Sequence, residues 1–151
     1  MTDFVAVLKQ NVVLVTASSA WFLAQVLKTL TNFLKYRQFN AERLVGAGGM
    51  PSSHTALVVS LSTAIGLKDG FHSSTFAIAL VLAGIVMYDA AGVRRAAGKH
   101  AKVLNRLVRQ MRAEHTVRDT KLKELLGHHP LEVLAGAILG IIVAYAFNVY
   151  W

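Results

Sequence analysis

The chain has 151 residues, of which 54% are hydrophobic and none is cysteine, and its formal net charge is +8. Its mean hydropathy of +0.47 is too high for an ordinary soluble domain. The lack of cysteine excludes a disulfide framework and a thiolate nucleophile or metal site. A chain that is both apolar and basic is typical of a small integral membrane protein whose charges lie in loops. Its length fits a single domain over residues 1–151.

Four apolar segments predict an all-α integral membrane bundle of about four transmembrane helices, at about residues 12–34, 52–67, 71–88 and 131–151. A span needs about 20 apolar residues, so the first and fourth segments are long enough and the third is adequate. The second is short, and we expect its start to be buried in protein or open to water. The N-terminal residues lack the pattern of a removable signal peptide.

Residues 94–127 form a long basic loop, with 10 basic residues against 3 acidic ones. Within it, apolar side chains recur at helical spacing and basic side chains occupy another face: Ala101, Leu104, Leu107, Val108 and Met111 against Lys99, Lys102, Arg106 and Arg109. This pattern predicts an amphipathic cytoplasmic helix that lies on an anionic membrane surface.

The order of the segments predicts a topology. A tight connection at Gly66–Gly70 indicates that the second and third segments form a hairpin. Threading the chain through a membrane then brings the segment ends that carry His54, Asp89 and His128 to one side, which also holds 14 of the 16 Lys and Arg residues. The positive-inside rule predicts a multi-pass cell-membrane protein with this side, and a site on it, facing the cytoplasm and both termini outside.

His128 and Glu132 are four residues apart, so on a helix they share a face, and the glutamate side chain points back toward the histidine. A carboxylate on one imidazole nitrogen fixes the tautomer and leaves the other nitrogen free as a nucleophile or base. Pro130 suits the first turn of a helix. The same residues also fit a capped helix start at the membrane interface, and both interpretations stay open.

The motif Pro-Ser-Ser-His at residues 51–54 marks a second helix start. Ser52 or Ser53 can cap this helix, and the free N–H groups of its first turn suit an anion. The preceding Gly48-Gly49 allows close approach of the backbone. His54 would lie beside the anion and could protonate a leaving oxygen. Taken alone, the motif is explained more simply as a turn and helix start with an interfacial histidine.

Further charged residues lie near the same side of the membrane. Lys28 is inside the first apolar segment, where a lysine either snorkels to the surface or faces a polar cavity and binds phosphate. Arg94 and Arg95 can bind phosphate oxygens in a bidentate manner, or can act only as positive anchors at the membrane edge. Asp89 can pair with one of these arginines.

Together these motifs resemble the type-2 phosphatidic acid phosphatase superfamily, and more specifically its divergent branch of small bacterial and plant membrane proteins. The superfamily motif Pro-Ser-Gly-His is similar to residues 51–54, and the motif His-x-Pro-x-Asp-Val-x-x-Gly is similar to residues 128–136. The sequences at 48–54 and 89–95 look like hallmarks of the divergent branch. The resemblance covers most of the chain from Gln25 onward.

The resemblance implies a role for each of these residues. His128 would be the nucleophile that takes the phosphoryl group, Glu132 the carboxylate that orients it, and His54 the general acid. Substrate binding would involve Lys28, Ser52, Ser53, Asp89, Arg94 and Arg95. The resemblance implies neither a cofactor nor a metal ion.

The chain departs from the superfamily pattern in three places. Leu122 stands where an arginine is expected before the nucleophile. The first motif is not intact, and several basic residues compete for it: Lys28, Lys35, Arg37 and Arg43. About four helices stand in place of six, and a second copy of the chain could supply the missing wall.

Two functions fit the sequence. The first is a metal-independent membrane lipid phosphatase that hydrolyses a phosphate or pyrophosphate monoester on a phosphatidate- or polyprenyl-type lipid through a phosphohistidine. The second is a non-catalytic protein that binds, scaffolds or transports a lipid phosphate. We expect a lipid phosphate substrate, anionic membrane lipids and a second copy of the chain as partners, the last through Gly136 and Gly140, whose spacing permits close helix packing or dimerisation. Nucleic acid is not expected, because the loop at 94–127 has no aromatic residue for base stacking.

Overall fold

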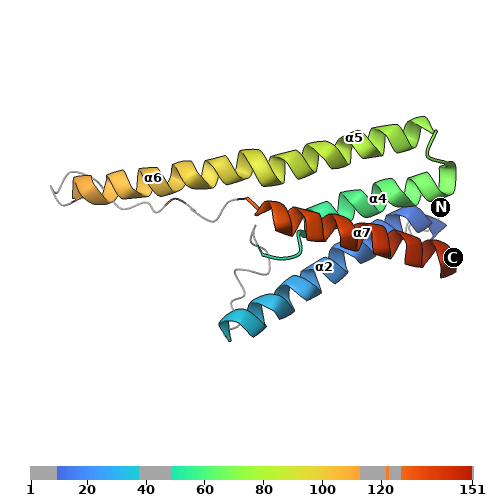
Figure 1. Cartoon of the computed structure of the whole chain (residues 1–151), viewed down its shortest axis with the longest axis horizontal. Coiled ribbons are helices and arrows are strands. Elements are labelled where there is room, and N and C mark those ends of the chain that lie inside the picture. Colours follow the sequence, from blue (N-terminus) through green and yellow to red (C-terminus); the bar gives the residue numbers. More distant parts are fainter. Residues whose placement is uncertain (1–9, 38–48, 113–121, 123–126, 151) are drawn as a thin grey trace, which may run out of the picture.

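The computed structural model describes residues 10–37, 49–112, 122 and 127–150. These residues form helices α2 (Val12–Tyr36), α4 (Ser53–Asp69), α5 (Ser74–Tyr88), α6 (Arg94–Arg112) and α7 (Pro130–Tyr150), with a π-helical turn η1 (Asp89–Val93) between α5 and α6. Three helical stretches are long and apolar enough to cross a membrane: Val12–Leu34, Ser74–Gln110 and Pro130–Tyr150. The predicted all-α membrane bundle is therefore confirmed (Figure 1).

Short polar side chains start three of the helices. Asn11 accepts a hydrogen bond from the N–H of Leu14 at 3.1 Å and caps α2. Ser52 and Ser73 cap α4 and α5 in the same way. Because these caps satisfy N–H groups that have no partner inside the helix, they fix where each helix begins. The predicted starts agree with the structure to within three residues.

Helix α4 is the centre of the bundle and packs against α2, α5 and α7. Its inward residues are mostly small, so the neighbouring helices approach closely: Ser53, Thr55, Ala56, Val58, Ser60, Ser62, Ala64 and Gly66. With 17 residues, α4 is about 25 Å long, shorter than a typical span. We expect the start of this segment to be buried in protein or open to water, and Ser52 and Ser53 at the start of α4 are indeed buried.

The two glycines of α7 provide close contact with α4. A Cβ atom on Gly136 would collide with the carbonyl oxygen of Ser52, and one on Gly140 would lie 2.7 Å from the carbonyl oxygen of Ala56. The G-x-x-x-G spacing therefore serves helix packing within the chain, which was one of its two predicted uses.

The hairpin between α4 and α5 lies later in the sequence than predicted. Helix α4 continues through Gly66 and ends at Asp69, and residues 70–73 make the connection. Gly66 is helical, and the ring of Phe71 folds against it, so that a Cβ atom there would lie 2.5 Å from the ring. The glycine marks a contact with this ring rather than the turn.

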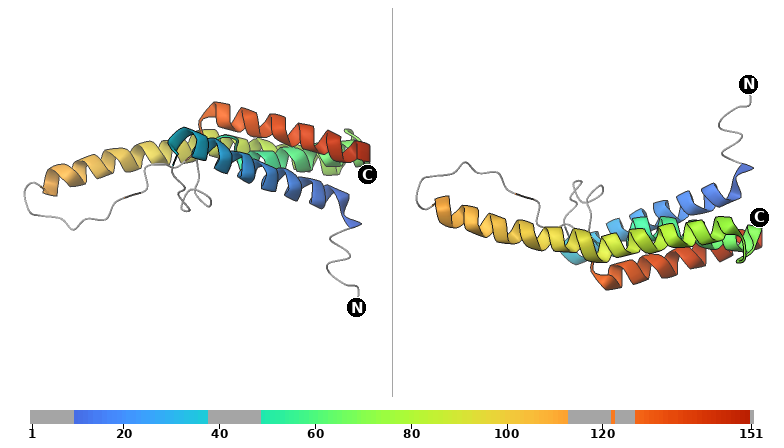
Figure 2. Two further views of the ribbon diagram at one scale, coloured as in Figure 1. Left: turned by 90° about the horizontal axis from the view of Figure 1, so that it is seen from below. Right: turned by 90° about the horizontal axis from the view of Figure 1, so that it is seen from above.

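Helices α5 and α6 form one nearly straight rod through η1 (Figures 1 and 2). The sequence predicts a helix within residues 94–127, but as a separate element lying on the membrane. In the structure it starts at Arg94 without a break, since the N–H of Arg94 bonds to the carbonyl of Asp89 across the π-turn. As a result α6 extends beyond the ends of the other helices.

The helix ends meet as the predicted topology requires. The end of α2, the start of α4, η1 and the start of α7 lie at one end of the bundle, and the start of α2, the end of α4, the start of α5 and the end of α7 lie at the other (Figure 1). The residues predicted to form a site are on the first set of ends.

Candidate functional site

His128 and Glu132 form a hydrogen-bonded pair at the start of α7. Nδ1 of His128 lies 3.0 Å from Oε2 of Glu132, and the histidine is only 5% exposed. His128 precedes the helix, which begins at Pro130, so the pair joins a turn residue to the first helical turn rather than two residues on one helix. The same carboxylate oxygen accepts the N–H of His129 at 3.0 Å. Glu132 therefore both contacts the imidazole and caps α7. The two interpretations of the sequence, an oriented histidine and a capped helix start, are compatible with each other.

Three further side chains lie close to this pair: Lys28, His54 and Arg94. Arg94, Lys28 and the imidazole of His128 are within electrostatic range of His54, and Glu132 is within electrostatic range of Lys28. Lys28 is 4% exposed although it lies within a membrane span. It therefore faces the bundle interior, since a snorkelling lysine would be exposed. We call the five residues the histidine cluster: Lys28, His54, Arg94, His128 and Glu132.

The turn before α4 holds the cluster against α2. The hydroxyl of Thr31 donates to the carbonyl of Met50 at 2.8 Å. Gly49 has a φ of +103°, and a Cβ atom there would lie 3.2 Å from Cγ of Lys28. Both the backbone conformation and the close approach require glycine. This turn therefore covers the buried lysine and delivers His54 beside it.

The π-turn η1 holds His128 from the opposite direction. The N–H of His128 donates to the carbonyl of Ala90 at 2.9 Å. Gly127 has a φ of +89°, and a Cβ atom there would collide with the backbone of Arg95. π-turns alter the regular hydrogen-bond pattern of a helix and often occur at functional sites. In this chain the π-turn η1 contacts the backbone of His128 through Ala90. The chain path into α7 therefore rests on η1.

Only one of the two predicted arginines joins the cluster through its charge. Nε of Arg94 lies 2.5 Å from Oδ2 of Asp89, which confirms that Asp89 pairs with an arginine. Arg94 also acts on His54. Arg95 is exposed and meets Gly127 through its backbone. Its predicted contact with substrate stays a prediction.

The first turn of α4 offers fewer N–H groups to an anion than the sequence suggests. Ser52, and not Ser53, is the cap: its Oγ accepts the N–H of Thr55 at 3.4 Å and the hydroxyl of Thr55 at 2.9 Å. The N–H of Ser52 is itself donated to the carbonyl of Glu132 at 3.0 Å. This N–H is therefore already paired, and the N–H groups of Ser53 and His54 are the candidates for an anion, while the contact of Ser52 with substrate stays a prediction.

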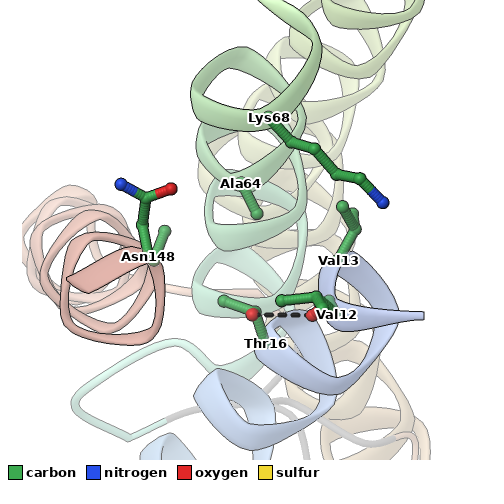
Figure 3. A pocket seen from close by; sticks show the side chains of 7 residues that line it. Val12, Val13, Thr16, Ala64, Lys68 and Asn148 are labelled. Atoms are coloured by element: carbon green, nitrogen blue, oxygen red, sulfur yellow. Dashed lines mark hydrogen bonds between the residues drawn. The ribbon is translucent and has the colours of Figure 1, made fainter. Parts of the chain in front are cut away.

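A pocket with a volume of about 220 Å³ lies at the other end of the bundle, between α2, α4 and α7 (Figure 3). Its lining includes Lys68 and Asn148 as polar side chains near the helix ends, with Thr16 deeper in. The hydroxyl of Thr16 bonds to the carbonyl of Val12 at 2.7 Å. The pocket contains no member of the histidine cluster, so it is separate from the candidate site.

Sequence reasoning missed the residues that support the cluster. Thr31 and Ala90 act through a hydroxyl and a carbonyl that no motif marks.

Other predicted or missed residues lie away from the cluster or outside the described part of the chain. Asn105 of α6 bonds twice to the backbone of Leu122, accepting its N–H at 3.0 Å and donating to its carbonyl at 2.8 Å. Lys35 is described only in its backbone, and Arg43 lies outside the described residues. Within the described ranges, no three His, Asp or Glu side chains are placed to hold a metal ion.

These residues define a helical membrane protein with a polar, charged site at one end of the bundle, formed by two histidines, a carboxylate and two basic side chains. The chain belongs to the Divergent PAP2 family, which it matches over residues 9–143. It is 40% identical over 152 residues to the uncharacterized membrane protein YuiD of Bacillus subtilis (strain 168), covering 91% of this chain and 96% of that protein. No solved structure matches the chain significantly.

Proposed function

We propose that the chain is a metal-independent membrane lipid phosphatase whose nucleophile is His128. The observation that carries the proposal is the 3.0 Å contact between Nδ1 of His128 and the carboxylate of Glu132. When Nδ1 donates its proton to this carboxylate, the lone pair lies on Nε2, the nitrogen that can attack phosphorus. Membership of the Divergent PAP2 family supports the same assignment.

The proposed reaction has two steps. In the first, Nε2 of His128 attacks phosphorus, the bond from phosphorus to the lipid oxygen breaks, and His54 gives its proton to that oxygen. In the second, water attacks the phosphohistidine, the P–N bond breaks, and His54 takes a proton from the water. The products are the lipid alcohol and inorganic phosphate, and both histidines return to their starting state. Glu132 stabilises the positive charge on His128 in the first step.

The substrate class follows from where the cluster lies. Lys28 and Arg94 supply positive charge for the phosphate, and most transition-state stabilisation in phosphoryl transfer is electrostatic. The cluster lies where α2 ends and α7 begins, and both helices are long and apolar enough to cross a membrane, so a lipid could present its headgroup here while its chain stays in the bilayer. We therefore propose a phosphatidate- or polyprenyl-type phosphate or pyrophosphate monoester. The excess of Lys and Arg on this side supports a cytoplasmic orientation.

A second candidate function is lipid-phosphate binding without chemistry, as in a scaffold or transport protein. The observation that favours it is the second contact of Glu132, whose carboxylate also caps α7. A protein without catalytic activity would still need this glutamate for the helix cap. Leu122 is exposed and bound to Asn105 through its backbone, and it brings no cation toward His128. In this case His128→Ala would leave cellular function intact, whereas Arg94→Ala would weaken lipid binding.

The two functions are separated by measuring phosphate release from purified protein in detergent. The lipids are phosphatidate, polyprenyl pyrophosphate and phosphatidylglycerol phosphate, and EDTA is present throughout. The phosphatase predicts release that persists in EDTA, disappears in His128→Ala and survives in His129→Ala, the matched neighbour. Release from none of the lipids by folded protein, or release that survives His128→Ala, would contradict it.

A further inference from the structure

Helix α6 has two sharply different faces. Over Arg94–Arg112 it carries seven Lys and Arg residues and no acidic residue. At 100° per residue the cations occupy one side of the helix: Arg94, Arg95, Lys99, Lys102, Arg106, Arg109 and Arg112. The opposite side carries Val103, Leu104 and Leu107, which are 57%, 48% and 48% exposed. The apolar side is therefore exposed at these three residues, whereas Ala101 of the same helix is only 7% exposed.

The rod places the start of α6 at the membrane surface. Residues Ser74–Val93 of α5 and η1 are about 30 Å long, which equals the thickness of the hydrocarbon core. Arg94 and Arg95 follow at once. Within the described part of the chain α6 packs mainly on η1, and the two views in Figure 2 show it standing clear of α2 and α7.

Charge decides what covers the apolar side. A second copy of α6 would bring no carboxylate to neutralise the seven cations, so charge complementarity favours an anionic partner over another α6. An anionic bilayer surface attracts each cation by about 1 kcal/mol and accepts the apolar side chains between its headgroups. The occupant that fits both sides of the helix is an anionic lipid surface.

The junction at η1 is open on one side. A Cβ atom on Gly92 would have no atom within 4 Å, whereas Ala90 and Arg95 contact the turn before α7. Helices kink at π-turns and at glycine, and both occur here. A straight α6 projects away from the bilayer, and a bend at η1 is the change that brings its apolar side onto the surface.

The same junction holds His128, through the carbonyl of Ala90 and the backbone of Arg95 against Gly127. A change in the direction of α6 therefore acts on the contacts that position His128. We propose that α6 docks on an anionic bilayer surface by bending at η1 and thereby sets the position of His128. The catalytic meaning of that position rests on the proposed phosphatase, whereas the docking itself does not.

The docking is tested in lipid nanodiscs with an environment-sensitive fluorophore. Because the chain has no cysteine, single variants take the label at one position. In Leu107→Cys the emission shifts to the blue in phosphatidylcholine–phosphatidylglycerol discs and not in phosphatidylcholine discs. Leu104→Cys repeats the result, and Lys102→Cys on the basic side keeps aqueous emission. Equal emission in both lipids, or a shift caused by single-stranded RNA instead, would overturn the proposal.

Two glycine variants test the bend. Gly92→Ala and Gly84→Ala both add a methyl group where no atom lies within 4 Å, and only the first is in η1. Alanine favours straight helix over glycine. In the Leu107→Cys protein, Gly92→Ala reduces the blue shift and Gly84→Ala retains it. The same shift in both would overturn the hinge. Neutralising Arg106 and Arg109 to Gln lowers the ratio of docked to free helix by about five-fold for each cation.

The coupling to His128 is tested with a label at its neighbour. In His129→Cys, emission changes when phosphatidylglycerol is added, and Gly92→Ala suppresses that change while Gly84→Ala does not. No change would overturn the coupling. Phosphate release is measured in the same discs. If no phosphate is released in either disc while both labels respond, the result rejects the phosphatase and supports docking. Release that is equal in both lipids while the labels respond rejects the regulation.

Discussion

Oε2 of Glu132 binds two groups at the same distance, Nδ1 of His128 and the backbone N–H of His129, both at 3.0 Å. The first contact needs a negative charge to support an imidazolium, whereas the second needs only an acceptor. Glutamine is as good as glutamate at this capping position. The two roles of Glu132 can therefore be separated by a single substitution.

Glu132→Gln is expected to lower kcat by on the order of 10⁴-fold while the melting temperature stays close to that of the wild type. The amide oxygen keeps the cap on α7 but loses the charge that stabilises His128. Steady-state phosphate release and thermal unfolding in detergent measure the two effects. Glu132→Asp serves as the control that keeps the charge and should retain part of the activity. Equal loss of activity and folding would show that Glu132 is only a cap.

The two adjacent arginines are expected to differ. Arg94→Gln should raise KM for the lipid phosphate by about 10-fold or more, because a hydrogen bond to a charged group contributes about 1.5–3 kcal/mol. Its ion pair with Asp89 is exposed and contributes little to stability. Arg95→Gln is the matched control and should change KM less, since Arg94 and not Arg95 is among the charges near His54. A larger effect at Arg95 would overturn the assignment of Arg94 to the cluster.

Lys28→Met should weaken phosphate binding without unfolding the protein. Methionine keeps the unbranched apolar stem in the span and removes the ammonium group. Because Lys28 is 4% exposed and acts on His54, we expect KM to rise and competitive inhibition by inorganic phosphate to weaken by about 10-fold or more. Lys68→Met, at the opposite end of the bundle, is the control. An unchanged inhibition constant in Lys28→Met would place Lys28 outside the anion site.

The helices could be predicted from the sequence because their signals are local. The apolar lengths, the capping serines before α4 and α5 and the charge distribution between segments identify the elements and the end at which they meet. The order of the elements then brings His54, Arg94 and His128 together. What local signals cannot give is the course of the chain at a junction. The continuity of α5 and α6 depends on a π-turn. The sequence at Gly66 suggests a turn, whereas the structure shows that this glycine makes room for the ring of Phe71.

The candidate site was predictable to the same extent. Its charged residues stand in motifs, and the structure places five of them in one cluster. The backbone hydrogen bonds of the site could not be predicted. No side-chain pattern indicates that the N–H of Ser52 donates to the carbonyl of Glu132, or that the N–H of His128 donates to the carbonyl of Ala90. Arg94 and Arg95 are chemically identical in the sequence, and only the turn of the helix distinguishes them.

Gly136→Ala should destabilise the protein by about 1–3 kcal/mol, because the added methyl group collides with the carbonyl of Ser52 at the tightest contact between α7 and α4. Gly84→Ala adds the same methyl group into open space and is the matched control. Thermal unfolding of the two variants in one detergent measures the difference. Equal melting temperatures would contradict the close packing of α7 on α4.

The measurement that tests the central claim most directly is detection of the phosphoryl group on the protein. The wild-type protein is mixed with a lipid phosphate that it turns over, quenched in base to preserve phosphohistidine, digested and analysed by mass spectrometry. The account predicts a phosphoryl group on His128 that is absent in His128→Ala. Turnover without a phosphorylated residue, or with the phosphoryl group on His129 or His54, would contradict it.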